Sequence, residues 1–234
     1  MGKPKNEQRA SWVASESAEE RSKRARTILR RLSKAYPSTT TALKHSNAFE
    51  LVVATVLSAQ STDKKINEIT EHLFKKYRTP KDYLAAAPGE LEEDIKQSGF
   101  FNQKARAIRG LCQTLIDEFG GEVPDTLPEL IRLPGVARKT ANVVLWNAFG
   151  QNEGVAVDTH VHRLSWRLGL SDHDDTNKVE QDLMALYPRA KWGLVTHCLI
   201  DHGRAICSAR APACADCVVN DVCPASRVPA KRAR

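Results

Sequence analysis

The side chains best suited to covalent chemistry in this sequence are Lys139 and Asp158. Lys139 closely follows Pro134 and Gly135, which predict a tight turn, and the apolar residues after it recur at helical spacing. A lysine in the first turn of a helix lies near the positive end of the helix dipole, which disfavours the ammonium form and favours nucleophilic work by the amine. The pattern therefore predicts a nucleophile at a helix N-terminus, with a carboxylate partner further along the chain.

The start of this predicted helix is also suited to binding phosphate. Backbone amides at a helix N-terminus have no intrahelical acceptor and attract anions. We expect phosphate contacts from Gly135, Val136, Ala137 and Arg138. A plainer interpretation, in which Lys139 is only a phosphate-contacting cation, stays open, because its amine needs partial burial as well as the helix terminus to become neutral. Arg138 cannot be the nucleophile, since its guanidinium stays protonated.

Asp158 and His160 belong to a second short motif, Val-Asp-Thr-His, which precedes another helical pattern. Asp158 can cap that helix, and capping is compatible with catalysis because a carboxylate fixed by amide hydrogen bonds stays ionised and well positioned. His160 has three candidate roles, as a base, as a phosphate donor or as a core residue. The sequence does not choose among them.

Four cysteines near the C-terminus predict a metal centre. They are Cys207, Cys214, Cys217 and Cys223, with the spacing C-x6-C-x2-C-x5-C. Four thiolates in so short a segment can close around one zinc ion or one iron-sulfur cluster, and the spacing alone favours neither. A pair of disulfides is a third interpretation, which an intracellular location disfavours. Cys112 and Cys198 fall inside apolar helical patterns and are interpreted as core residues.

The bulk composition is compatible with a polyanionic partner. The 234 residues include 35 Lys and Arg against 28 Asp and Glu, which gives a net charge of +7 and a pI of about 9.1. Residues 1–18 lack periodicity and are predicted to form a flexible basic tail. The N-terminus has no apolar signal region and no run approaches eighteen apolar residues, so we expect a cytoplasmic protein with no membrane partner.

Helical periodicity extends over most of the chain and predicts an all-α fold. A strongly basic helix over 19–36 stops at Pro37. Asn47 and Glu50 form a capping-box pattern before an almost continuously apolar helix, which must be central. The apolar stretch 155–157 is too short for a sheet and is interpreted as an extended connector. Further helical patterns end at Tyr77 and cover 101–119, 127–132, 159–168 and 190–206.

Gln60 and Phe100 are predicted to lie at corners between helices. The plain interpretation of both is ordinary turn packing. In a protein that binds DNA, an amide side chain and an apolar wedge are the groups needed to fill a base stack from which one base has been removed.

Taken in order, these motifs resemble the bacterial endonuclease III family, a group of base-excision DNA glycosylases in the helix-hairpin-helix superfamily. The resemblance covers about residues 26–224. It is carried by Leu57 to Asp63, Gly99 to Ala105, Leu133 to Val144, Val157 to His160, His202 to Arg204 and the four cysteines.

The resemblance implies two helical domains. One is a six-helix barrel domain with a helix-hairpin-helix motif over 41–151, and the other is an iron-sulfur cluster domain formed by 19–40 plus 152–234. One 4Fe-4S cluster held by the four cysteines is implied in place of zinc. The implied protein is a monomer that acts at the bacterial nucleoid on double-stranded DNA containing oxidised pyrimidines or abasic sites.

The resemblance also implies a chemistry. Lys139 attacks C1′ of the flipped nucleotide, the base leaves, and beta-elimination from the resulting Schiff base breaks the strand on the 3′ side of the abasic site. Asp158 assists by stabilising positive charge and by proton transfer. Gln60 fills the space left by the flipped base, and Phe100 stands where the family often has a leucine wedge.

Two residues depart from the family pattern. Ala137 replaces the second glycine of the usual Leu-Pro-Gly-Val-Gly-Arg-Lys hairpin, and a positive φ at this position would strain an alanine. Phe100 is bulkier than leucine, which affects how the opposite strand is wedged. Two other functions stay open. One is a monofunctional glycosylase that uses Asp158 with water, and the other is a non-enzymatic DNA-binding iron-sulfur module.

Overall fold

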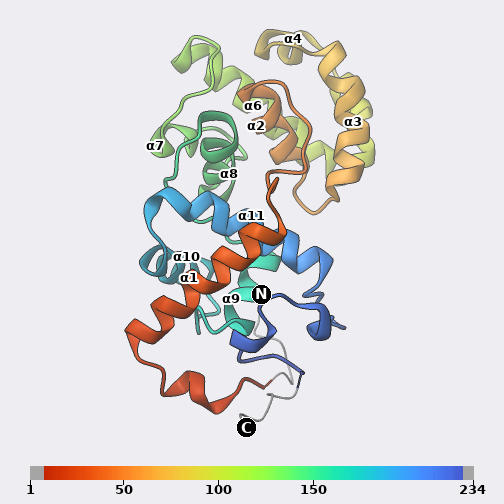
Figure 1. The fold of residues 1–234 in the computed structure, drawn as a ribbon. Helices are drawn as coiled ribbons and strands as arrows, with labels where there is room; N and C mark the ends of the chain where they lie inside the picture. The colour runs from red at the N-terminus through yellow and green to blue at the C-terminus, as the bar shows by residue number, and fades with distance from the viewer. Residues whose placement is uncertain (1–7, 229–234) are drawn as a thin grey trace. The chain divides into compact units, whose positions relative to one another are not determined.

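A computed structural model describes residues 8–228 of this chain. The chain divides into two compact units, with the divisions between residues 40 and 41 and between 151 and 152. The described residues form helices and turns, and no strand occurs among them, which confirms the all-α prediction (Figure 1). No helix in this part of the chain is long and apolar enough to cross a membrane.

The unit formed by 41–151 is built around one apolar helix, α2. Asn47 caps this helix by accepting a hydrogen bond from the amide of Glu50, and almost every position after the cap is buried. A helix that is apolar on all sides must be surrounded, and α2 packs against α3, α6 and α8. The helices of this unit are α2 (Ala48–Leu57), α3 (Asp63–Lys76), α4 (Pro80–Ala85), α5 (Glu90–Asp94), α6 (Phe101–Phe119), α7 (Leu127–Leu130) and α8 (Arg138–Phe149).

The other unit joins the N-terminal helix to the C-terminal part of the chain. Its core lies where α11 packs on α1 and α9, with α10 against α9 and α1. The stretch 155–157 is the predicted extended connector, and all three of its residues are buried. The helices are α1 (Ala18–Ala35), α9 (Thr159–Arg167), α10 (Thr176–Leu186) and α11 (Trp192–Ala205), followed by short 3₁₀ turns at Cys214–Asp216 and Asn220–Val222.

Residues 8–18 of the predicted flexible tail make specific contacts in this structure, while residues 1–7 lie outside the described chain. A 3₁₀ turn forms at Ser11–Ala14 and buries Val13. The amide of Ala10 donates to the carbonyl of Pro224, 2.7 Å away, and the guanidinium of Arg24 lies over the ring of Trp12. Local periodicity missed these contacts because their partners lie far away in the sequence.

Candidate active site

The Pro-Gly hairpin is a tight turn that requires glycine at its corner. Gly135 has a φ of +82°, and a Cβ atom added there would lie 3.1 Å from the Cβ of Ala107. The next amide, that of Val136, donates to the carbonyl of Leu133 at 3.0 Å, and the Val136 side chain is buried. The Val136 amide is therefore used within the turn and is not available to a phosphate, contrary to the expectation that every amide of this segment faces an anion.

Ala137 adopts an unstrained backbone conformation as the N-cap residue of α8. Its φ of −86° and ψ of 168° lie in the extended region, so alanine in place of the family's glycine introduces no strain. No side chain caps this helix, and the carbonyl of Ala137 accepts the first helical hydrogen bond from Ala141 at 2.9 Å. The start of α8 thus keeps the open geometry of a phosphate-binding helix N-terminus.

Lys139 is the second residue of α8, and its side chain is exposed. The partial burial expected for a lysine with a neutral amine is absent in this structure. An exposed amine at this position is accessible to a substrate that arrives from solvent.

Asp158 is the N-cap residue of α9, as the sequence predicts. One carboxylate oxygen accepts a hydrogen bond from the amide of Val161 at 2.8 Å, and the residue is half-buried. This bond fixes the carboxylate and leaves its second oxygen available for chemistry.

His160 is the second residue of α9 and is half-buried. Burial lowers the pKa of its imidazole, an effect that the carboxylate of Asp158 opposes. A guanidinium nitrogen of Arg163 lies 3.1 Å from Nδ1. A Cβ on Gly203 would lie 2.8 Å from this nitrogen, so the glycine of the His-Gly-Arg motif makes room for the ring. These contacts fix the orientation of the imidazole ring.

Gln60, Phe100 and Gly135 line one surface cavity in the unit 41–151. Gln60 and Phe100 have φ angles of 55° and 49°, and they are the only residues other than glycine with positive φ in the described chain. Such conformations cost on the order of 1–3 kcal/mol each and persist where the surroundings hold them. Phe100 is 60% exposed, which is unfavourable for a large apolar side chain that has no partner. Ordinary turn packing therefore does not explain Phe100.

Sequence reasoning missed Lys104, which lines the same cavity. This lysine is only 5% exposed, and its ammonium donates to the carbonyl of Ser98 at 2.7 Å. Burial lowers its pKa. The available signal was the position of a lysine on the same helical face as buried Ala105 and Ile108, where a solvated cation is not expected.

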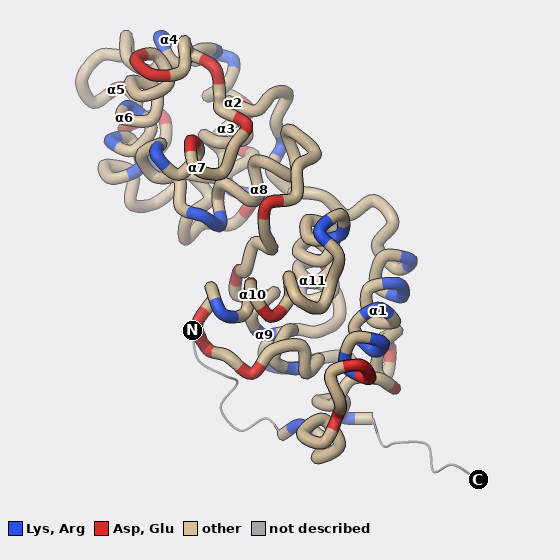
Figure 2. Tube along the Cα trace, turned by 90° about the vertical axis from the view of Figure 1, so that its left-hand side faces the viewer, with Lys and Arg blue, Asp and Glu red and all other residues tan. Residues whose placement is uncertain are grey.

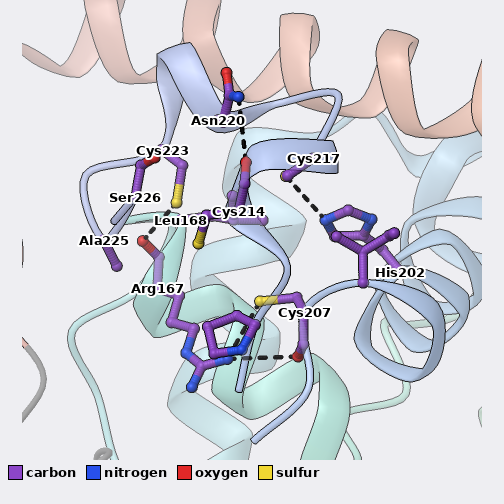
Figure 3. Close-up of a pocket in the computed structure, with 12 residues that line it drawn as sticks. Arg167, Leu168, His202, Cys207, Cys214, Cys217, Asn220, Cys223, Ala225 and Ser226 are labelled. Atoms are coloured by element: carbon purple, nitrogen blue, oxygen red, sulfur yellow. Dashed lines mark hydrogen bonds between the residues drawn. The ribbon is translucent and has the colours of Figure 1, made fainter. Parts of the chain in front are cut away.

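The four clustered cysteines surround one cavity in the other unit (Figure 3). All four are free thiols, so the disulfide interpretation does not hold in this structure. A guanidinium nitrogen of Arg167 lies 3.3 Å from the sulfur of Cys207, and Nε2 of His202 lies 3.3 Å from the sulfur of Cys217. No group of three or more His, Cys, Asp or Glu residues within 8–228 has the geometry to hold a single metal ion.

These surroundings fit a thiolate-bound cluster. Four cysteine sulfurs line one pocket, and nitrogen atoms of two side chains approach two of the sulfurs, as hydrogen bonds to cluster sulfurs require. Cys112 and Cys198, by contrast, are fully buried in the helical cores, which confirms their interpretation as core residues.

The fold and the hairpin define a helix-hairpin-helix DNA repair protein. Residues 53–189 match the family model for the HhH-GPD superfamily base excision DNA repair proteins. The chain is 47% identical to endonuclease III of Synechocystis sp., over 87% of this chain and 93% of the relative. It is 48% identical to endonuclease III of Bacillus subtilis, over 80% of this chain and 86% of the relative.

Solved structures give the same result. A trapped endonuclease III–DNA covalent intermediate matches with a TM-score of 0.84 and 45% identity, over 88% of this chain and 97% of that chain. The chain therefore belongs to the endonuclease III family, whose members are DNA glycosylases and abasic-site lyases of base excision repair. The predicted family and fold class are confirmed.

Proposed function

We propose that this chain removes oxidised pyrimidines from duplex DNA and cleaves the abasic site, with Lys139 as nucleophile and Asp158 as its carboxylate partner. The observation that carries this proposal is the exposed amine of Lys139 in the first turn of α8, directly after an unstrained Pro-Gly hairpin. An arginine or an apolar residue at this position could not form an imine.

In the proposed reaction, Nζ of Lys139 forms a bond to C1′ while the bond from C1′ to the base breaks. The leaving base keeps the bonding electron pair and takes up a proton. Opening of the sugar ring gives a Schiff base between Nζ and C1′, and loss of a proton from C2′ then expels the 3′ phosphate oxygen. This step breaks the strand without water as a reactant and without any change in oxidation state.

Asp158 is proposed to support these steps as a fixed anion. Its hydrogen bond to the Val161 amide holds the carboxylate in place, where it can stabilise positive charge on the sugar and accept the amine's proton. His160 is proposed to contact a phosphate through its imidazole, which lies beside the guanidinium of Arg163.

The DNA contacts are proposed to divide between the hairpin and the cavity. Gly135, Ala137 and Arg138 contact backbone phosphate near the start of α8, with Val136 contributing its buried side chain to the turn rather than its amide. Gln60 and Phe100 are the proposed filler and wedge, because each is exposed and is held in a left-handed conformation at the edge of one cavity.

We further propose that Cys207, Cys214, Cys217 and Cys223 hold one 4Fe-4S cluster. The support is the convergence of four thiols on one cavity with Arg167 and His202 beside two of the sulfurs. Such a cluster would supply a rigid link among loops that have little regular structure. Iron and acid-labile sulfide content, together with visible absorption, test this proposal, and a colourless protein that holds one zinc ion would contradict it.

Trapping with borohydride tests the lysine mechanism. The reductant converts an imine on abasic-site DNA into a stable covalent complex, which we expect for the unaltered chain and not for Lys139→Ala. A complex that persists in Lys139→Ala would contradict the role of this lysine. Base release without any trapped complex would instead support a monofunctional glycosylase. Action as a monomer at the nucleoid in the cytoplasm stays a prediction.

A further inference from the structure

The basic residues of α1 are divided into two groups by the fold. Between residues 21 and 34 this helix carries seven Lys and Arg side chains and no Asp or Glu (Figure 2). Three of the seven are paired. Arg24 and Arg21 form ion pairs with Glu16, and Arg31 pairs with Asp221. The paired side chains therefore serve the packing of this unit.

The other four cations form a continuous stripe on the solvent side of α1, which we call the α1 basic stripe. Its members are Lys23, Arg26, Arg30 and Lys34, and each is exposed. Their spacing of three, four and four residues places them on one face of the helix, opposite the face that buries Ala25, Ile28 and Leu32. At 1.5 Å per residue the stripe extends over about 16 Å.

The α1 basic stripe lacks the acidic residues that usually accompany a solvated helix face. Among residues 8–228, no carboxylate forms an ion pair with any of its four members. Neighbouring cations at i,i+4 repel each other by about 0.2–0.5 kcal/mol per pair, so this pattern opposes the stability of the helix. A row of cations that lowers helix stability and forms no internal ion pair is suited to binding an external anion.

We propose that the α1 basic stripe binds the phosphate backbone of double-stranded DNA, as a damage-independent contact additional to the proposed catalytic residues. A duplex presents one negative charge per 1.7 Å of axis, or about 9 phosphates on its two strands over the length of the stripe. A rigid line of cations matches such a regular array. An acidic protein is the less favoured partner, because protein interfaces require apolar or aromatic anchors and no exposed large apolar residue in the described chain belongs to α1.

Binding of a short undamaged duplex at increasing salt tests this contact. Each phosphate contact contributes about 0.9 to the slope of log affinity against log salt. The double variant Lys23→Gln/Lys34→Gln should therefore lower the slope by about 1.8 between roughly 50 and 200 mM salt. Changing all four stripe residues to glutamine should lower it by about 3.6.

The matched control is Lys178→Gln/Lys191→Gln, which removes the same charge from two exposed lysines of the same unit. The control should change the slope by much less than the stripe variant. The midpoint of thermal unfolding should stay constant or rise in the stripe variants, because repulsion is relieved. Borohydride trapping of a saturating abasic-site duplex should be unchanged, which separates this proposal from the proposed chemistry.

Equal slopes for stripe and control variants would show that the cations act only through net charge, and would overturn the proposal. A stripe variant that keeps its DNA slope but loses binding to poly-L-glutamate would assign the surface to an acidic protein instead. A fall in the unfolding midpoint without a change in slope would show a structural role and would equally contradict the contact.

Discussion

Lys104 holds both sides of the loop that carries Phe100. Its ammonium donates to the carbonyl of Ser98 at 2.7 Å, and its backbone amide donates to the carbonyl of Phe100 at 3.1 Å. The loop between these two anchors includes Gly99 and the left-handed residue Phe100. A buried lysine is costly, and this one makes its contact with a backbone carbonyl, so its effect is to fix the loop in one conformation.

Replacement of Lys104 by methionine should therefore impair the proposed wedge. We expect KM for lesion-containing duplex to rise about tenfold with little change in kcat, because the loop no longer holds Phe100 in position. The same rise is expected for Phe100→Ala. Both changes remove the same function, the wedge formed by Phe100. In a double-mutant cycle, KM of the double variant should therefore equal that of either single variant. Additive losses would contradict the positioning role, and Lys96→Met provides a nearby exposed control.

Capping and catalysis by Asp158 can be separated with two substitutions. Asparagine caps a helix as well as aspartate does, so Asp158→Asn should unfold at the same denaturant concentration while single-turnover base release falls by roughly 10²-fold or more. Asp158→Ala should lose both activity and about 0.5–2 kcal/mol of stability. Full activity in Asp158→Asn would show that the residue is only a cap.

The hairpin should tolerate change at Ala137 and not at Gly135. Alanine at position 135 would require a positive φ and a Cβ 3.1 Å from the Cβ of Ala107, so Gly135→Ala should destabilise the fold by about 1–3 kcal/mol and weaken DNA binding. Ala137→Gly restores the family residue where φ is negative and should change stability by less than about 1 kcal/mol. Chemical denaturation and duplex binding measure both effects, and equal losses at the two positions would contradict this account.

His197 should make stability depend on pH. This residue is almost fully buried in α11, and burial lowers its pKa to about 4 from an ordinary value of 6.5. Between these two values the unfolded chain binds a proton that the folded chain does not, so the free energy of unfolding should fall as pH decreases from 6.5 to 4. The expected slope for this residue is at most about 1.4 kcal/mol per pH unit.

Comparison with His197→Phe isolates this contribution. The variant removes the titrating group and leaves the other histidines in place. As pH falls through this window, the unaltered protein should therefore lose more unfolding free energy than the variant. A difference that stays constant from pH 7 to pH 4 would show that His197 does not contribute to acid sensitivity.

Local sequence features determined the elements and much of the site. Helical periodicity predicted α2 as the central helix, and Pro134 with Gly135 predicted the turn that precedes Lys139. Asp158 before an apolar helix predicted a cap, which the hydrogen bond to Val161 confirms. These predictions succeed because turns, caps and periodic apolar faces depend on residues a few positions apart.

The tertiary structure decided what depends on distant residues. Lys104 is buried only because α6 packs against α2, α4 and α5, which the residues around it in the sequence do not reveal. The segment that contains Val13 is ordered by contacts with Arg24 and Pro224, so its own polar composition could not reveal it.

For the cysteines, too, the sequence determined one part of the site and the tertiary structure another. Their spacing predicted a shared centre, while the approach of Arg167 and His202 to the sulfurs required the packing of α9 and α11. Residue type and spacing thus set which chemical groups are available. The burial of those groups and their contacts with distant segments, which set how the groups behave, arise only when those segments exclude water together.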